Sequence, residues 1–204
     1  MPLPPRVFLL SPAHLGGERA RILLRDEARF DLATRVKGEG APIGEIFAFL
    51  SGLYFRGKLH YATAFASPPR PDVAPAYVIT SDRGLITVDT RFAKRQLEQM
   101  GTSDIDARNH EYRKPLERDA RKLAKKIGDA EVVLLGSIAS TKYIEVLEEI
   151  FAERLVFPID FVGRGDMSRG SLMLRAARAG VELPYVSVCD VLGAKLLACR
   201  ARSS

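Results

Sequence analysis

The stretch Val7-Phe8-Leu9-Leu10-Ser11-Pro12-Ala13-His14 begins with four apolar residues, 7–10, and continues directly into a loop that contains Ser11 and His14. A short run that is apolar at every position is typical of a strand that is buried on both faces of a sheet. Four further runs share this character and lie at residues 76–80, 132–135, 155–157 and 185–188. The sequence therefore predicts an α/β fold in which a mostly buried mixed sheet is covered by helices.

Longer stretches between these runs carry apolar residues at helical spacing. Residues 43–66 form one such stretch, and Gly52 and Gly57 predict a break within it. A second helix is predicted over residues 116–127, because its apolar positions share one face. The proline-rich segment at residues 67–71 is too short to separate two domains, so residues 1–204 are expected to form a single domain.

Composition narrows the classes of function. The chain has 204 residues, of which 47% are hydrophobic, and its 31 basic and 25 acidic residues give a formal charge of +6. This charge favours polyanionic partners, although many enzymes that do not bind nucleic acid are as basic. Two separated cysteines and three scattered histidines suggest neither a disulfide nor a zinc site. No apolar run reaches the length of a membrane span, so we expect a cytoplasmic protein without membrane contact.

Polar loops follow the first two predicted strands. Ser11 and His14 come directly after the first strand, and this arrangement suits an anion or a sugar as well as an ordinary helix start with Ser11 as its cap. Asp82 and Arg83 follow the second strand, where the carboxylate can accept from a hydroxyl or a base edge and the guanidinium can pair with phosphate. The same tetrapeptide, residues 81–84, is also a good turn.

The loops after the third and fourth strands are also candidates for anion binding. Ser140 and Lys142 lie where a helix is expected to begin, so the serine can cap the helix or leave its amides free. Residues 163–170 are rich in glycine and are followed by a helical run from 172 to 179, so they predict either an anion-binding loop or a structural turn. The candidate phosphate-binding residues of this loop are Gly163, Arg164, Gly165, Ser168 and Arg169.

A row of cations marks the predicted helix at residues 116–127. Lys114, Arg118, Arg121 and Lys125 lie opposite its apolar face. Such a row is either an ordinary solvated face or a stripe that follows a nucleic-acid backbone.

Five short motifs, read in order, resemble the YaaA family, the peroxide-stress proteins of bacteria. Residues 9–14, Leu-Leu-Ser-Pro-Ala-His, are similar to the strand and Ser-Pro-Ala-Lys that open that family, with His14 in place of the lysine. Residues 51–59 resemble its Gly-x-x-Tyr-x-Gly-Leu segment, and residues 79–85 its Leu-Ser-Gly-Leu-Tyr-Gly-Leu. Residues 138–143 and 164–169 resemble Leu-Ala-Ser-Asn-Glu-Tyr and Arg-Gly-x-Met-Ala-Arg. The chain is shorter than typical members of the family.

The resemblance implies a DNA-binding α/β fold with a basic cleft and a role in limiting oxidative damage. It also extends to enzymes that handle nucleobases, including glycosylase-like and RNA-modifying proteins. In that alternative, His14 and Asp82 are the candidate general acid and base, and Ser140, Lys142, Arg164 and Arg169 hold phosphate. The expected partner is thus DNA, another nucleic acid or a free nucleotide, while the sequence indicates neither a cofactor nor an oligomeric state.

Overall fold

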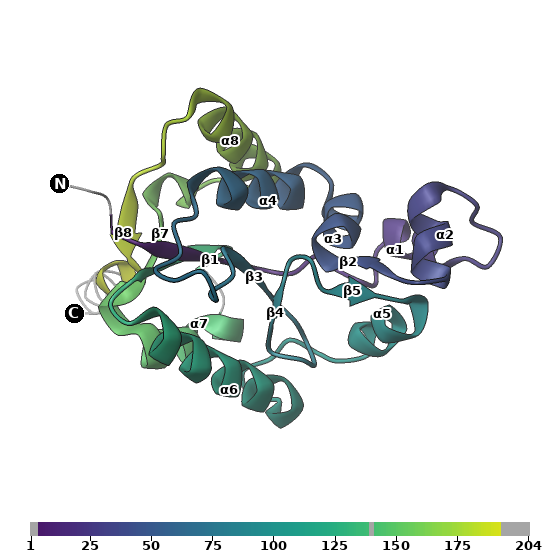
Figure 1. Ribbon diagram of the computed structural model, residues 1–204, viewed down its shortest axis with the longest axis horizontal. Coiled ribbons are helices and arrows are strands. Elements are labelled where there is room, and N and C mark those ends of the chain that lie inside the picture. The colour runs from purple at the N-terminus through teal and green to yellow at the C-terminus, as the bar shows by residue number, and fades with distance from the viewer. Residues whose placement is uncertain (1–3, 139–140, 193–204) are drawn as a thin grey trace, which may run out of the picture.

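A six-stranded sheet forms the centre of the molecule (Figure 1). The computed structural model describes residues 4–138 and 141–192. The sheet has the order β4-β3-β1-β6-β7-β8, and a separate two-stranded sheet joins β2 and β5. The strands are β1 (Arg6–Leu10), β2 (Ala41–Pro42), β3 (Ala76–Ile79), β4 (Leu85–Thr87), β5 (Arg91–Phe92), β6 (Glu131–Leu135), β7 (Leu155–Pro158) and β8 (Tyr185–Ser187).

The four central strands β3, β1, β6 and β7 run parallel, whereas β4 and β8 pair antiparallel at the two edges. In register, Leu10 of β1 lies beside Val78 of β3 and Leu135 of β6. All five residues of β1 are buried, as expected for the middle of a sheet with both faces covered. The prediction of an α/β fold with a buried mixed sheet is therefore confirmed.

Helices cover both faces of this sheet. Figure 1 shows α4 and α8 on one face and α6 and α7 on the other. The helices are α1 (Glu18–Leu24), α2 (Asp31–Lys37), α3 (Ile43–Ser51), α4 (Leu53–Phe65), α5 (Lys94–Gly101), α6 (His110–Ile127), α7 (Thr141–Phe151) and α8 (Asp166–Ala179), with short 3₁₀ turns η1 (Ala152–Arg154) and η2 (Ile159–Phe161). Nearly all buried apolar residues belong to one hydrophobic cluster.

The predicted break within residues 43–66 lies at Gly52, which separates α3 from α4. Its φ of +59° falls in the region that glycine adopts at low cost. Gly57, the other candidate for the break, is instead inside α4, where a Cβ would stand 2.7 Å from the carbonyl oxygen of Gly170 in α8. Gly57 therefore lets two helices cross in backbone contact.

The glycine-rich stretch at residues 163–170 corrects one prediction. It was expected to be a loop before a helix at 172, but α8 already begins at Asp166, with Gly165 as its N-cap. A Cβ at Gly170 would lie 2.7 Å from the carbonyl oxygen of Leu53. Gly170 thus serves the α4–α8 crossing, and only the residues before Asp166 form a loop.

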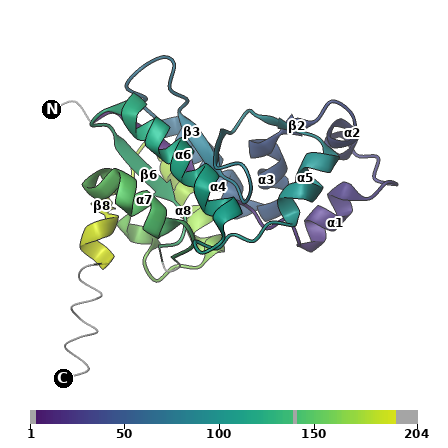
Figure 2. The ribbon, with the colours of Figure 1, turned by 90° about the horizontal axis from the view of Figure 1, so that it is seen from below.

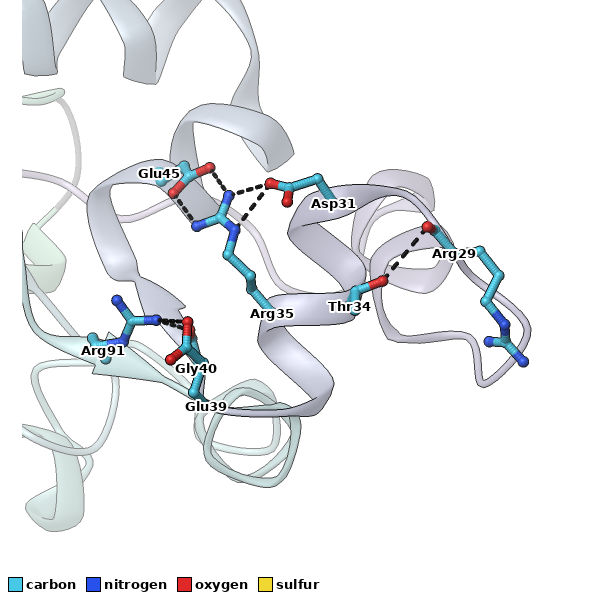
Figure 3. Close-up of polar contacts among 8 residues, drawn as sticks. All are labelled: Arg29, Asp31, Thr34, Arg35, Glu39, Gly40, Glu45 and Arg91. Atoms are coloured by element: carbon cyan, nitrogen blue, oxygen red, sulfur yellow. Dashed lines mark hydrogen bonds and ion pairs between the residues drawn. The ribbon is translucent and has the colours of Figure 1, made fainter.

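A lobe made of α1, α2, α3, α5 and the β2–β5 pair lies to one side of the main sheet (Figures 1 and 2). Figure 3 shows ion pairs that hold this lobe together. Arg35 of α2 donates to Asp31 at 2.9 Å and to Glu45 of α3 at 2.8 Å. Arg91 of β5 donates to the Gly40 carbonyl at 2.6 Å. These contacts join α2, α3 and the small sheet into one unit.

An arginine inside the sheet also carries an ion-pair network. Arg6 of β1 is 5% exposed and its guanidinium lies 3.1 Å from Glu131 of β6 and 2.6 Å from Glu182. Because buried charges require partners, this network ties β1 to the segment that leads into β8.

Candidate functional site

A polar cavity at the carboxyl edge of the sheet opens where β1 ends. The chain leaves β1 toward β3 on one side and returns to β6 on the other side, so β1 and β6 flank the point at which ligands collect in open α/β sheets. A pocket of about 510 Å³ lies there, and we call it the Ser11 pocket. Its walls come from the loops after β1 and β6, the start of α1, the α3–α4 turn, and α7 and α8.

Ser11, the first residue after β1, is hydrogen-bonded to a lysine that the motif analysis did not single out. The Nζ of Lys58 in α4 lies 2.7 Å from the Ser11 Oγ and 2.9 Å from the Ser11 carbonyl oxygen. Ser11 lines the pocket, whereas Lys58 is 1% exposed. The serine hydroxyl therefore stands between a buried amine and the cavity.

The surroundings of Lys58 disfavour its charged form. The contacts of its Nζ with the rings of Tyr54 at 3.9 Å and Phe55 at 5.5 Å attract an ammonium group, but no ion pair to Lys58 occurs among the described residues. Burial lowers the pKa of Lys58 to about 7, while Asp166 raises this pKa and Arg169 lowers it further. A substantial fraction of Lys58 is therefore the neutral amine at neutral pH.

A tyrosine hydroxyl completes the polar end of the pocket. Tyr143 of α7 donates to the Ser137 carbonyl at 2.9 Å. Burial raises the pKa of Tyr143, and hydrogen bonds to Ser11 and Ser137 offset part of this rise. A Cβ on Gly136 would lie 2.8 Å from the Tyr143 hydroxyl and 3.1 Å from the Ser11 Oγ. Gly136 thus leaves the space in which the two hydroxyls approach each other.

Helix α8 brings a carboxylate and an arginine to the same region. Asp166 lines the Ser11 pocket, and its Oδ1 lies 3.7 Å from Arg169. Arg169 also donates to the Phe161 carbonyl at 3.1 Å. Tyr54 has a buried hydroxyl that lacks a hydrogen-bond partner in the described residues, and burial raises its pKa to about 12, an effect that Arg169 opposes. These groups lie near Lys58 because α4 and α8 cross in backbone contact at the adjacent positions 57 and 170.

Arg19 stands at the mouth of the pocket. Its guanidinium donates to the Phe49 carbonyl at 3.1 Å, and a Cβ on Gly52 would lie 2.5 Å from its Nη1. The α3–α4 break therefore provides the space that holds this cation in place. Glu18 and Asp166 are the carboxylates of the lining, so the pocket has mixed charge.

His14 is exposed and lines both the Ser11 pocket and a neighbouring cavity of about 270 Å³, which we call the Met100 pocket. Ser81 and Lys142 also line the Met100 pocket, and Ser81 is fixed by donating to the Met100 carbonyl at 2.6 Å. The loops after β1 and β3 and the start of α7 thus meet around His14.

Asp82 and Arg83 lie beside this region without lining either pocket. The Arg83 Nε lies 3.2 Å from the Asp82 carboxylate, and the guanidinium also stacks near Phe92 at 5.3 Å. Asp82 retains one buried oxygen without a hydrogen bond in the described part of the chain. The pair therefore behaves as an internal contact of the turn, and Asp82 does not share a pocket with His14.

The other predicted phosphate-binding residues are more dispersed. Arg164 donates to the Asp160 carbonyl at 2.8 Å and to Ser168 at 3.2 Å, so both side chains are engaged within their own loop and helix end. Gly163 and Arg169 line a small cavity of about 80 Å³ next to Ser137, and Gly165 caps α8. Ser140 lies outside the described residues.

The predicted cation row is exposed along α6. Lys114, Arg118, Arg121 and Lys125 all face solvent, but Arg118 pairs with Asp119 at 2.8 Å and Arg121 with Glu149 at 2.9 Å. None of the four lines the Ser11 pocket. The cation row and the pocket are therefore separate surfaces.

Comparison with known families, curated proteins and solved structures found no match to this chain. The resemblance to the YaaA family consequently remains a prediction from the motifs. Within residues 4–138 and 141–192, no helix has the length and apolar character needed to cross a bilayer. The same residues contain no group of three or more His, Cys, Asp or Glu side chains that could hold a metal ion.

Proposed function

We propose that the chain is an enzyme that acts on a nucleotide- or nucleobase-sized substrate bound in the Ser11 pocket. The observation that carries this proposal is the convergence of strand-end loops from β1 and β6 with α4, α7 and α8 around one cavity, whose wall residue Ser11 is hydrogen-bonded to a buried lysine of lowered pKa. A strongly perturbed titratable group next to a cleft is characteristic of catalytic sites.

The charges of the lining favour a small ligand over a long polyanion. Arg19 can pair with one phosphate, while Glu18 and Asp166 can accept hydrogen bonds from sugar hydroxyls or from exocyclic amines. Two carboxylates would repel the continuous negative charge of a DNA backbone. A nucleoside monophosphate, in contrast, offers both donors and one anionic group.

Calorimetric titration with nucleosides and nucleoside monophosphates tests the proposal. We expect the monophosphate to bind more tightly than the nucleoside, and Arg19→Ala to remove about tenfold of the affinity for the monophosphate only, which corresponds to one charge-assisted contact. Arg56→Ala is the matched control, because Arg56 is exposed on α4 and does not line the pocket. If none of these compounds binds, the proposed ligand class is contradicted.

The second candidate is DNA binding of the YaaA peroxide-stress type, and the exposed face of α6 favours it. Six cations are exposed on this one helix, namely Lys114, Arg118, Arg121, Lys122, Lys125 and Lys126. Such a row can neutralise consecutive phosphates and release counterions. In this candidate the contact surface is α6, on the opposite face of the sheet from α4 and α8 (Figure 1).

Retention of duplex DNA at increasing salt tests the second candidate. If α6 binds DNA, replacing Lys114, Arg118, Arg121 and Lys125 by Ala should weaken retention and reduce its salt dependence. The control is Arg25→Ala, which removes an exposed arginine outside α6 and outside the predicted phosphate-binding residues. Equal retention of the quadruple variant and the native protein would rule out this surface.

A further inference from the structure

We infer that Ser11 is a nucleophile activated by Lys58, and that the Ser11 pocket transfers or hydrolyses an acyl group carried by its substrate as an ester or thioester. This inference rests on the proposed use of the pocket as a substrate site. It adds the reaction class and the two groups that perform it.

The first support is the position of the serine. Ser11 follows the last residue of β1, where the chain is fixed by the Ser11 amide donating to the Leu135 carbonyl at 3.2 Å. Ser11 lines the pocket while being 8% exposed, and its Oγ lies 2.7 Å from the Nζ of Lys58, which does not line the pocket. A nucleophile requires this arrangement, with the base within hydrogen-bond reach and one side open to substrate.

The second support is that Lys58 has the properties of a base and lacks access to substrate. Its Nζ contacts Ser11 and the ring of Tyr54, and the residue is 1% exposed. The charged groups near it are Asp166 and Arg169 of α8, which have opposite signs. Burial holds the pKa of Lys58 at about 7, so the neutral amine can accept the Ser11 proton. Because Nζ is covered by Ser11, the serine oxygen rather than the amine is the atom that can attack.

The reaction balances with Ser11, Lys58, the substrate and water. As the Ser11 Oγ forms a bond to the carbonyl carbon, its proton passes to the Lys58 Nζ. The tetrahedral intermediate then expels the alcohol or thiol as its anion, which takes a proton from a water molecule in the cavity. The hydroxide formed in this way attacks the acyl-serine ester, and the Ser11 Oγ leaves and takes back the proton held on Lys58, which releases the acid and restores both residues. No oxidant, reductant or further reactant takes part.

An acyl group suits the pocket better than a phosphoryl group does. Phosphoryl transfer spreads negative charge over several oxygens and calls for several cations, whereas this lining combines one arginine, Arg19, with the two carboxylates of Glu18 and Asp166. A carbonyl develops charge on a single oxygen, for which one donor is useful. Tyr143 keeps its proton at neutral pH because burial raises its pKa. The structure has this proton donated to the Ser137 carbonyl, so the hydroxyl must turn from Ser137 toward the pocket to serve as such a donor.

Labelling with a fluorophosphonate, a probe that reacts with activated serine hydroxyls, tests the inference on the 204-residue protein. We expect one adduct, located on Ser11 by peptide mass spectrometry and absent from Ser11→Ala. Lys58→Met should slow labelling at least about 100-fold, the usual contribution of a general base. Ser67→Ala and Lys122→Met are the matched controls, because both residues lie outside the pocket, and they should react at the native rate.

The pH profile of the native protein tests Lys58 without any substitution. The labelling rate should rise with pH through a midpoint near the pKa of about 7. The groups that face Lys58 are Ser11, Tyr54, Asp166 and Arg169. His14 also lines the pocket, so a midpoint that disappears in His14→Gln would assign the titration to the imidazole and overturn the role of Lys58.

Two outcomes separate this inference from the proposed function. Nucleotide binding by a folded protein that forms no Ser11 adduct would overturn the inference and leave the proposed ligand class standing. A Ser11 adduct that depends on Lys58, in a protein that binds no nucleotide, would support the Ser11–Lys58 pair and remove the nucleotide as its ligand. Labelling of Lys58→Met at the native rate would overturn the inference whatever the ligand.

Discussion

Replacing Lys58 by Met should change how the stability of the protein depends on pH. Burial lowers the lysine pKa from 10.5 to about 7 in the folded state, whereas the unfolded chain keeps the ordinary value. Between these two values the unfolded state binds more protons, so the free energy of unfolding of the native protein rises with pH. Methionine fills a similar volume without a proton, so Lys58→Met lacks this contribution.

The size of the effect follows from the two pKa values. The free energy of unfolding of Lys58→Met, relative to that of the native protein, should be greatest below about pH 7. This difference should shrink by about 2 kcal/mol between about pH 7 and pH 9. The loss of the hydrogen bonds to Ser11 shifts the difference by a constant amount and leaves its pH dependence unchanged. Urea unfolding followed by circular dichroism at several pH values measures this gap. Other titrating groups are common to both proteins and cancel. A gap that stays constant over this range would show that the folded protein does not depress the lysine pKa.

Three further substitutions probe the packing around the site. Gly57→Ala should destabilise the fold by about 2 kcal/mol, because its Cβ would meet a backbone carbonyl of α8 at 2.7 Å. Gly101→Ala is the control, because its Cβ would make only an ordinary contact at 3.5 Å. Its free energy of unfolding in urea should change by less than about 0.5 kcal/mol. Gly136→Ala should cost about 2 kcal/mol and slow fluorophosphonate labelling, since its Cβ would displace the hydroxyls of the pocket; unchanged labelling would contradict the described approach of those hydroxyls. Arg6→Met should lower the free energy of unfolding by about 3 kcal/mol, because Glu182 loses its buried partner, and a loss below about 0.5 kcal/mol would show that water replaces the arginine.

The strands were predictable because burial on both faces leaves a plain signal in the sequence. Residues 7–10 and 132–135 are apolar throughout, and the structure places β1 and β6 there, within one residue of the predicted bounds. The start of α8 was not predictable, because Gly165 and Gly170 suggest a loop to any local rule. Gly170 lies in a helix for a reason that only the tertiary structure contains, namely contact with the backbone of α4.

Part of the candidate site could also be predicted from the sequence. Ser11 was identified from its place after a buried strand, and His14 from the same loop. Lys58 was not predicted as a site residue, because it stood within the motif at residues 51–59 and was not considered by itself. Its position carried a signal, since Tyr54, Lys58 and Tyr61 recur at the spacing of one helix face, and a lysine between two buried aromatic residues on that face is unusual. Asp82 lines neither pocket with His14, and sequence could not show that its carboxylate lies 3.2 Å from the Arg83 Nε.

Because of the backbone contact between Gly57 and Gly170, the pKa of Lys58 depends on the spacing between α4 and α8. The residues next to these two glycines are Lys58 and Arg169, so the tightness of the crossing sets how much solvent and how much opposing charge the amine experiences. Any change that pried α4 from α8 by the width of a methyl group would admit water and return the amine toward its ordinary basicity. The measured pKa of Lys58 would then report a displacement of α4 relative to α8 that originates elsewhere along the two helices.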